Sequence, residues 1–481
     1  MKDSVKQYLK AGNLFILTIL FVSFLQAQTV EKATTHYDHQ HGHTGDADTT
    51  SLLYAFRSGT LHGHFRYFFM ATDNRSGLSD YYGQAAGGGI RYETAKFKGF
   101  QVAIGGFYIF NIGSSNLTHP DPLTGQANRY EIGLYDVEDP SNKKDIDRLE
   151  EFYLKYSHGK GSIILGRQLL NTPFINLQDG RMRPTGVEGI YGEWKAHKKL
   201  TVEGGWLYAI SPRSTTRWFN VDESMGVYPS GVRADGAKSQ YHGNLTSAGA
   251  FQLGIHANPG KKLALHGWDL FVENIFNAAM IQADYRLPLK DKQSVLISVM
   301  GIRQDILHNG GNNDPALAYA TPGSHAWAFS GRAGWSDERW EATLNYTRIT
   351  ADGRYLMPRE WGRDPFYTFM PRERNEGFGD VDAVAVMTTY KVPRKGLKAA
   401  ISAGYYQLPE ISDFRLNKYG LPSYYQVNTE IRYQFHGLLK GMDAQLLVAA
   451  KKRAGELPSN LKYVINKVDM INYNLVVNYN F

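Results

Sequence analysis

The last segment of the chain alternates apolar and polar side chains with a period of two. In a β-strand the two sets lie on opposite faces. A bulky apolar face that ends in Tyr and Phe fits lipid, and a face of Asn fits a water-filled lumen. A strand of a soluble sandwich would alternate too, but it would not explain why the pattern recurs. The apolar set is Ile471, Tyr473, Leu475, Val477, Tyr479 and Phe481, and the polar set is Asn472, Asn474, Asn478 and Asn480, interrupted only by Val476.

The same alternation recurs along most of the chain. The segments 340–347, 425–435 and 442–451 repeat it, at about the 9 to 11 residues that a tilted membrane-spanning strand needs. The pattern is weakest over 248–287. We expect eighteen strands, at 60–71, 84–96, 100–111, 149–158, 161–168, 187–195, 201–210, 248–258, 263–273, 275–287, 294–302, 325–336, 340–350, 380–392, 397–407, 424–436, 442–452 and 468–481.

The connections alternate in length, which supports this count. Short links with turn residues, such as Pro393 to Gly396, separate long ones. The short link near Asn274 to Asn277 is the exception, because parity places it among the long ones. The sequence therefore predicts an all-β, transmembrane, antiparallel up-and-down barrel with short periplasmic turns and long extracellular loops. The long links are 112–148, 169–186, 211–247, 303–324, 351–379, 408–423 and 453–467.

The first residues have the composition of a targeting segment. Three Lys precede an apolar run from Leu14 to Leu25, and Ala27 follows at a position typical of cleavage. We expect a signal peptide at 1–27, a disordered His-rich periplasmic tail at 28–58 and the barrel at 59–481. The expected location is the outer membrane of a Gram-negative bacterium, with its lipids and lipopolysaccharide as neighbours. Export makes nucleic acid an improbable partner, although the formal net charge is +7.

Motifs for catalysis and cofactor binding are missing from the sequence. There is no Cys, no Gly-x-Ser-x-Gly, no His-Glu-x-x-His and no P-loop. We therefore predict neither an enzyme nor a bound cofactor. The tail contains His36, His39, His41 and His43, which suit Zn²⁺, Ni²⁺ or Cu²⁺, but a merely disordered polar tail explains them as well.

The third outer loop, 169–186, combines an apolar run at Pro173 to Ile175 with Arg181 and Arg183. A loop that folds into a lumen needs an apolar anchor and polar groups that face the pore. Arg binds a carboxylate with two parallel hydrogen bonds and stays charged. We hypothesise that Arg181 and Arg183 form part of an anion-selecting constriction. The alternative is that they pair with carboxylates of the lumen and stiffen the loop.

Other basic residues point inward by the phase of their strands. Arg66, Arg286, Arg332 and Arg432 are candidates for contact with a solute. Carboxylates such as Glu430 share the same surface, so internal ion pairs are expected as well.

The seventh loop, 351–379, interleaves five Arg with aromatic residues such as Trp361 and Phe369. This mixture suits a sugar or an aromatic acid. The alternative, which we favour at this point, is an outer loop whose arginines contact lipopolysaccharide phosphates and whose aromatics pack together.

Several segments resemble the OprD-type family of substrate-selective porins. They are the run from Gly59 to Asn74, Phe152 to Tyr156, Leu165 to Arg167, and the stretch from Asn171 through Asp179 to Pro184. The resemblance implies a monomeric or loosely trimeric eighteen-stranded barrel whose narrow, basic constriction admits small carboxylate solutes. Phe481 also resembles the aromatic ending that such barrels present to the outer-membrane insertion machinery.

We therefore expect a porin for passive, partly selective diffusion of small water-soluble, anionic nutrients. The alternative is a barrel that does not conduct and acts as a structural, adhesive or assembly-partner protein.

Overall fold

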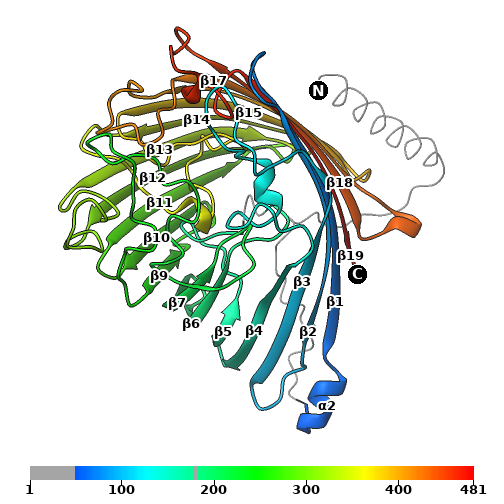
Figure 1. Ribbon diagram of the computed structural model, residues 1–481. Helices are drawn as coiled ribbons and strands as arrows, with labels where there is room; N and C mark the ends of the chain where they lie inside the picture. The colour runs from blue at the N-terminus through cyan, green and yellow to red at the C-terminus, as the bar shows by residue number, and fades with distance from the viewer. Residues whose placement is uncertain (1–48, 178–180) are drawn as a thin grey trace.

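Eighteen long strands form one closed antiparallel barrel in the computed structural model, which describes residues 49–177 and 181–481 (Figure 1). Each strand pairs with the next along the chain, and β19 pairs with β1. β8 (Phe219–Asn220) is a two-residue strand that pairs with the end of β7. The rest of that edge of β7 pairs with β9, which is the next strand of the barrel wall. The long strands are β1 (Thr60–Asp73), β2 (Tyr81–Glu93), β3 (Phe100–Ser114), β4 (Ile146–His158), β5 (Gly161–Gln168), β6 (Gly186–His197), β7 (Leu200–Ser211), β9 (Ala250–Ala257), β10 (Leu263–Val272), β11 (Phe276–Pro288), β12 (Ser294–Ile306), β13 (His325–Ser336), β14 (Trp340–Ile349), β15 (Val381–Val392), β16 (Leu397–Gln407), β17 (Tyr424–Gln434), β18 (Met442–Arg453) and β19 (Met470–Asn480).

These strands coincide with the eighteen predicted segments, including the three in the weakly patterned stretch 248–287. Their ends differ by a few residues; β12, for example, continues to Ile306 instead of ending at 302. The predicted alternation of short turns and long loops is confirmed, together with the short connection between β10 and β11. We call the two ends of the barrel the turn end and the loop end.

The two faces of the strands differ as the alternation predicts. On β14, Leu344 is 55% exposed and Tyr346 is 45% exposed, whereas Asn345 between them is fully buried. Asn472 and Asn474 of β19 are buried on the inner face in the same way. An outer wall of large apolar side chains is unsuited to water, so the barrel is of the membrane-spanning type.

The described helices are short and form no part of the barrel wall. α2 (Leu52–Arg57) begins after Ser51, whose Oγ accepts a hydrogen bond from the Tyr54 amide at 3.2 Å. Its Ala55 carbonyl accepts one from the Ala95 amide at 3.0 Å. The prediction that the tail is disordered up to residue 58 is therefore wrong for its last residues, because these contacts hold them against the turn after β2. The 3₁₀ helices are η1 (Glu131–Leu134), η2 (Arg359–Trp361), η3 (Gly437–Leu439) and η4 (Leu461–Tyr463).

Residues 1–48 lie outside the described part of the chain, and so do the predicted signal peptide and the four histidines of the tail. No helix among the described residues is long and apolar enough to span a bilayer.

The seam between β1 and β19 gives a direct test of barrel closure. Phe69 stands opposite Leu475, and Phe65 stands opposite Tyr479. Since the chain has no Cys, the double variant Phe69→Cys, Leu475→Cys should form a disulfide in the folded barrel, visible as a shifted band on a non-reducing gel. The control pair Phe69→Cys, Tyr479→Cys is offset by four residues, roughly 13 Å, and should not cross-link. Equal cross-linking of both pairs would contradict this register.

Candidate solute-binding chamber

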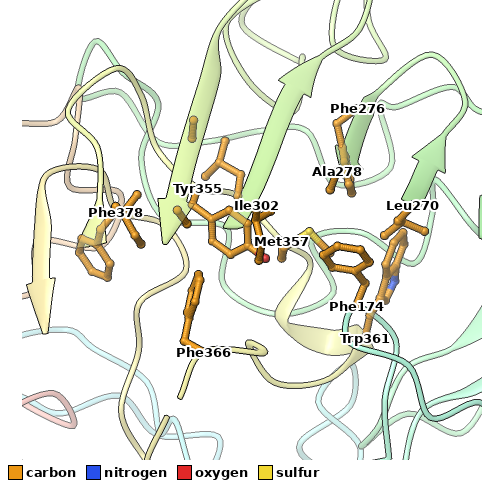
Figure 2. Packing of buried hydrophobic residues seen from close by; sticks show 14 of the residues in the cluster. Phe174, Leu270, Phe276, Ala278, Ile302, Tyr355, Met357, Trp361, Phe366 and Phe378 are labelled. Atoms are coloured by element: carbon orange, nitrogen blue, oxygen red, sulfur yellow. The ribbon is translucent and has the colours of Figure 1, made fainter. Parts of the chain in front are cut away.

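Loops 3 (described at 169–177 and 181–185) and 7 (350–380) fold into the barrel and are anchored by apolar side chains. Phe174 of loop 3 lies beside Met357 and Trp361 of loop 7, and this group packs against Leu270 on the wall (Figure 2). Trp361 and Leu270 are fully buried. The apolar anchor predicted for loop 3 is therefore present, and loop 7 provides its partner.

Hydrogen bonds then join loop 3 to loop 7, both between backbone groups and between a side chain and the backbone. Asn176 donates its amide to the Trp361 carbonyl at 3.1 Å and its Nδ2 to the Arg363 carbonyl at 3.0 Å. The Arg363 amide donates back to Asn176 Oδ1 at 3.1 Å. Gly362 stands between them, and a Cβ there would come within 2.6 Å of the Asn176 side chain. Only glycine allows so close an approach.

Loop 4 (212–249) is joined to the same pair of loops. Trp361 Nε1 donates to Ser224 Oγ at 2.9 Å, and the Gly226 amide donates to Glu360 Oε1 at 2.5 Å. Thr185 Oγ1 of loop 3 donates to the Glu360 carbonyl at 2.5 Å. Three loops that are distant in sequence thus form one packed unit inside the barrel.

This unit and loop 2 (115–145) enclose a cavity of about 880 Å³. We call it the chamber. Every described residue that lines it belongs to loops 2, 3, 4 or 7, and among these residues eight are basic whereas three are acidic. The basic residues are Arg129, Arg181, Arg213, Lys238, Arg359, Arg363, Arg372 and Arg374, and the acidic ones are Asp364, Glu373 and Glu376.

Arg374 is the clearest sign that cations crowd the chamber. Burial, together with the positive charges of Arg129 and Arg359, lowers the pKa of Arg374 to about 9. Arg359 lies 3.8 Å from Glu376, but neither Arg129 nor Arg374 forms an ion pair within the described part of the chain. A bound anion would relieve the repulsion between these guanidinium groups.

Aromatic rings hold the guanidinium planes in place. Arg374 lies over Tyr419 with its Cζ 4.6 Å from the ring centroid, and Arg129 lies over Tyr130 at 5.3 Å. Stacking fixes the plane of an Arg side chain while its edge remains available for hydrogen bonds to a carboxylate.

Two of the carboxyl groups in the chamber favour the neutral form. Burial and the nearby Glu376 raise the pKa of Asp364 to about 7. Burial, and after it the charge of Asp364, raises the pKa of Glu373 well above its ordinary value, and neither of its carboxyl oxygens has a hydrogen-bond partner among the described residues. Below neutral pH the chamber is therefore more positive than its residue count suggests.

The chamber should lose positive charge as pH rises. Asp364 is largely neutral below pH 7 and negative above it, so its ionisation removes one net positive charge from the chamber. One unit charge acting across roughly 10 Å of water is worth about 0.4 kcal/mol, or about twofold in ion permeability. We expect the preference for anions, measured as a reversal potential, to fall by at least that factor between pH 6 and pH 9. Asp364→Asn should reduce the change; an identical pH response in this variant would exclude Asp364 as its source.

The structure places the two predicted loop 3 residues differently. Arg181 lines the chamber, and its carbonyl accepts a hydrogen bond from Arg66 Nη1 at 2.5 Å. Arg183 forms an ion pair with the buried Glu150, and its Cζ lies 4.3 Å from the centroid of the Phe107 ring. The geometry of Arg183 therefore matches the alternative prediction, in which this residue pairs with a carboxylate of the lumen and stiffens the loop.

The four predicted strand residues face the lumen but do not line the chamber. Arg66 donates a hydrogen bond from Nε to Asn478 Oδ1 at 2.7 Å. Its bond to the Arg181 carbonyl holds loop 3 against the barrel wall. Arg332 lies over Tyr367 of loop 7 at 4.3 Å. Arg286 and Arg432 are near the turn end, where Arg286 Nη1 donates to Ser294 Oγ at 2.9 Å and Arg432 pairs with Glu430.

Loop 7 supplies four of the basic residues that line the chamber, and its aromatics pack as expected. The interpretation that directs its arginines to lipopolysaccharide is wrong for Arg372 and Arg359, which lie inside the barrel. Arg372, for example, donates Nε to Asn472 Oδ1 of β19 at 2.7 Å. Sequence reasoning missed Arg129 and Arg213 altogether, because loops 2 and 4 show no periodicity that would indicate their inward path.

Comparison with known proteins places the fold. No family model and no curated protein matches the sequence. Among solved structures, OpdK of Pseudomonas aeruginosa with vanillate aligns over 89% of this chain and 99% of its own, with a TM-score of 0.68 at 14% identity. The fold is that of the OprD-type porins. OccK9 (OpdG) of Pseudomonas aeruginosa, at 14% identity, has a TM-score of 0.69 over 89% of this chain and 99% of its own. OccAB1 of Acinetobacter baumannii has a TM-score of 0.67 at 14% identity, over 89% of this chain and 97% of its own.

Proposed function

We propose that the chain is a porin of the bacterial outer membrane that lets small anionic solutes, carboxylates above all, diffuse passively through a basic chamber. The observation that carries this proposal is the chamber itself, whose described lining has eight basic residues against three acidic ones. Its crowded guanidinium groups attract an anion, and its stacked arginines offer the paired donors that a carboxylate accepts.

The similarity of the fold to solved porin structures is a second, independent support for the proposal. Solved structures with this barrel are porins, and one of them was determined with vanillate, which is itself a carboxylate. For this chain we infer the same class of solute and no enzymatic role. We further take residues 1–27 as a signal peptide that is absent from the mature barrel.

Solute preference can be measured by swelling of liposomes that contain the purified barrel. Gluconate and glucose have similar sizes and differ mainly in charge, so gluconate should enter several times faster, and lysine should be slower than either. Equal rates for gluconate and glucose would refute a basic selectivity filter. No swelling with any solute would instead favour the alternative of a non-conducting structural or assembly-partner barrel.

A further inference from the structure

Two histidines face each other across neighbouring strands on the inner wall, near the turn end and outside the chamber. His256 of β9 stands directly opposite His266 of β10. Their neighbours Ile255 and Leu265 are exposed on the outer face, so the imidazoles belong to the lumen. The side chains of His256 and His266 are 19% and 27% exposed, which leaves them accessible from the lumen.

The orientation of the rings brings two Nδ1 atoms together. His256 Nδ1 lies 2.7 Å from His266 Nδ1. On the far side, His256 Nε2 lies 2.8 Å from Glu203 Oε1, and His266 Nε2 lies 3.8 Å from Asp284 Oδ2. An ionised carboxylate only accepts hydrogen bonds, so Nε2 of His256 carries its proton and Nδ1 presents a lone pair to His266. A proton or a metal cation must lie between the two Nδ1 atoms, because two bare lone pairs repel each other.

The surroundings keep this geometry fixed. The Glu203 carboxylate also accepts a hydrogen bond from the Tyr191 hydroxyl at 2.8 Å. The Trp268 ring stands edge-on to His256, with their centroids 5.0 Å apart. It occupies the space over Gly254, where a Cβ would come within 2.7 Å of the indole. A carboxylate behind a histidine, with a packed ring beside it, is the arrangement that orients metal-binding imidazoles.

We propose that His256 and His266 bind a divalent copper or nickel ion through their Nδ1 atoms. With metal–nitrogen bonds of roughly 2.0 Å, an Nδ1–Nδ1 separation of 2.7 Å gives an angle of about 85° at the metal. Neighbouring ligands of a square-planar or octahedral ion subtend nearly that angle, which favours Cu²⁺ or Ni²⁺ over tetrahedral Zn²⁺. When the metal binds at Nδ1 of His266, the proton of that ring moves from Nδ1 to Nε2. The Nε2–H group can then donate a hydrogen bond to the Asp284 carboxylate.

Water molecules complete the coordination of the metal ion. Within the described ranges, no group of three or more His, Cys, Asp or Glu is arranged to hold a metal ion. The site is therefore open and exchangeable. Occupied, it adds two positive charges to the wall below the chamber.

Binding of Cu²⁺ to the purified full-length barrel tests the proposal. The four tail histidines also suit copper, so the measurement uses a background in which His36, His39, His41 and His43 are all changed to Ala. This protein should bind one Cu²⁺, with nitrogen splitting from two imidazoles in its electron paramagnetic resonance spectrum. His256→Gln, His266→Gln should remove that signal. Absence of bound copper in the background protein, or an unchanged signal in the double variant, would overturn the proposal.

A second pair of variants separates binding from folding. Glu203→Gln leaves both ligands in place but weakens the hydrogen bond behind His256, so the affinity for Cu²⁺ should fall by roughly tenfold. Glu193→Gln is the matched control, because Glu193 lies opposite Glu203 on β6 and is not bonded to either histidine. Equal affinities in the two variants would show that Glu203 does not position the site.

Discussion

Replacement of Trp361 by Ala should release loops 3, 4 and 7 from the barrel interior and raise single-channel conductance several-fold. Trp361 is fully buried, packs with Phe174 and Met357, and donates its indole hydrogen to Ser224. Removal of a buried aromatic of this size costs about 3–5 kcal/mol. The strand ladders do not depend on this residue, so the cost falls on the loop unit and the barrel itself should persist.

Trp340 offers a matched control for this variant. It is 45% exposed on the outer face of β14, where it lies against Tyr390. Trp340→Ala should leave conductance unchanged. If Trp361→Ala also conducts like the parent protein while its strand content is retained, the loop unit does not limit the passage.

Neutralising Arg129 and Arg374 together should produce the largest loss of anion preference. Both line the chamber, and in the described ranges neither is matched by a carboxylate in an ion pair. A charge within roughly 5 Å of a passing ion is worth about 0.8 kcal/mol in water, so two of them account for at least about a tenfold change in the chloride to potassium permeability ratio. The change should shrink as salt is raised, because screening weakens the field.

The control for this double variant removes two arginines that already have partners outside the chamber. Arg217 pairs with Glu138, and Arg303 pairs with Asp305 at 2.6 Å. Arg217→Gln, Arg303→Gln should therefore leave the permeability ratio near that of the parent. A similar loss in both double variants would mean that overall charge, and not the chamber, sets the selectivity.

The strands were predictable because a barrel wall has a different solvent on each side. That difference forces a period of two on every strand, and the residues of β19 display it almost without interruption. The order of strands followed from loop lengths. Even the pairing of β1 with β19 followed, since a membrane barrel must have no open edge.

The chamber was only partly predictable. The apolar run at Pro173 to Ile175 predicted that loop 3 folds into the lumen, and Arg181 does line the cavity. Loop 7, in contrast, was expected to be an outer loop in contact with lipopolysaccharide. The path of a loop, however, depends on contacts between residues far apart in sequence. Asn176 with Arg363, and Trp361 with Ser224, leave no periodic signal, so neither the inward fold of loop 7 nor the part played by Arg129 was visible.

The reversal potential of the unmodified barrel in a planar bilayer, under a tenfold gradient of potassium chloride at pH 6, is the most direct test of the basic chamber. At this pH Asp364 is largely neutral and the chamber is at its most positive. A potential of the sign that chloride flow produces is the result we predict. A potential of the opposite sign, set by potassium, would contradict the account.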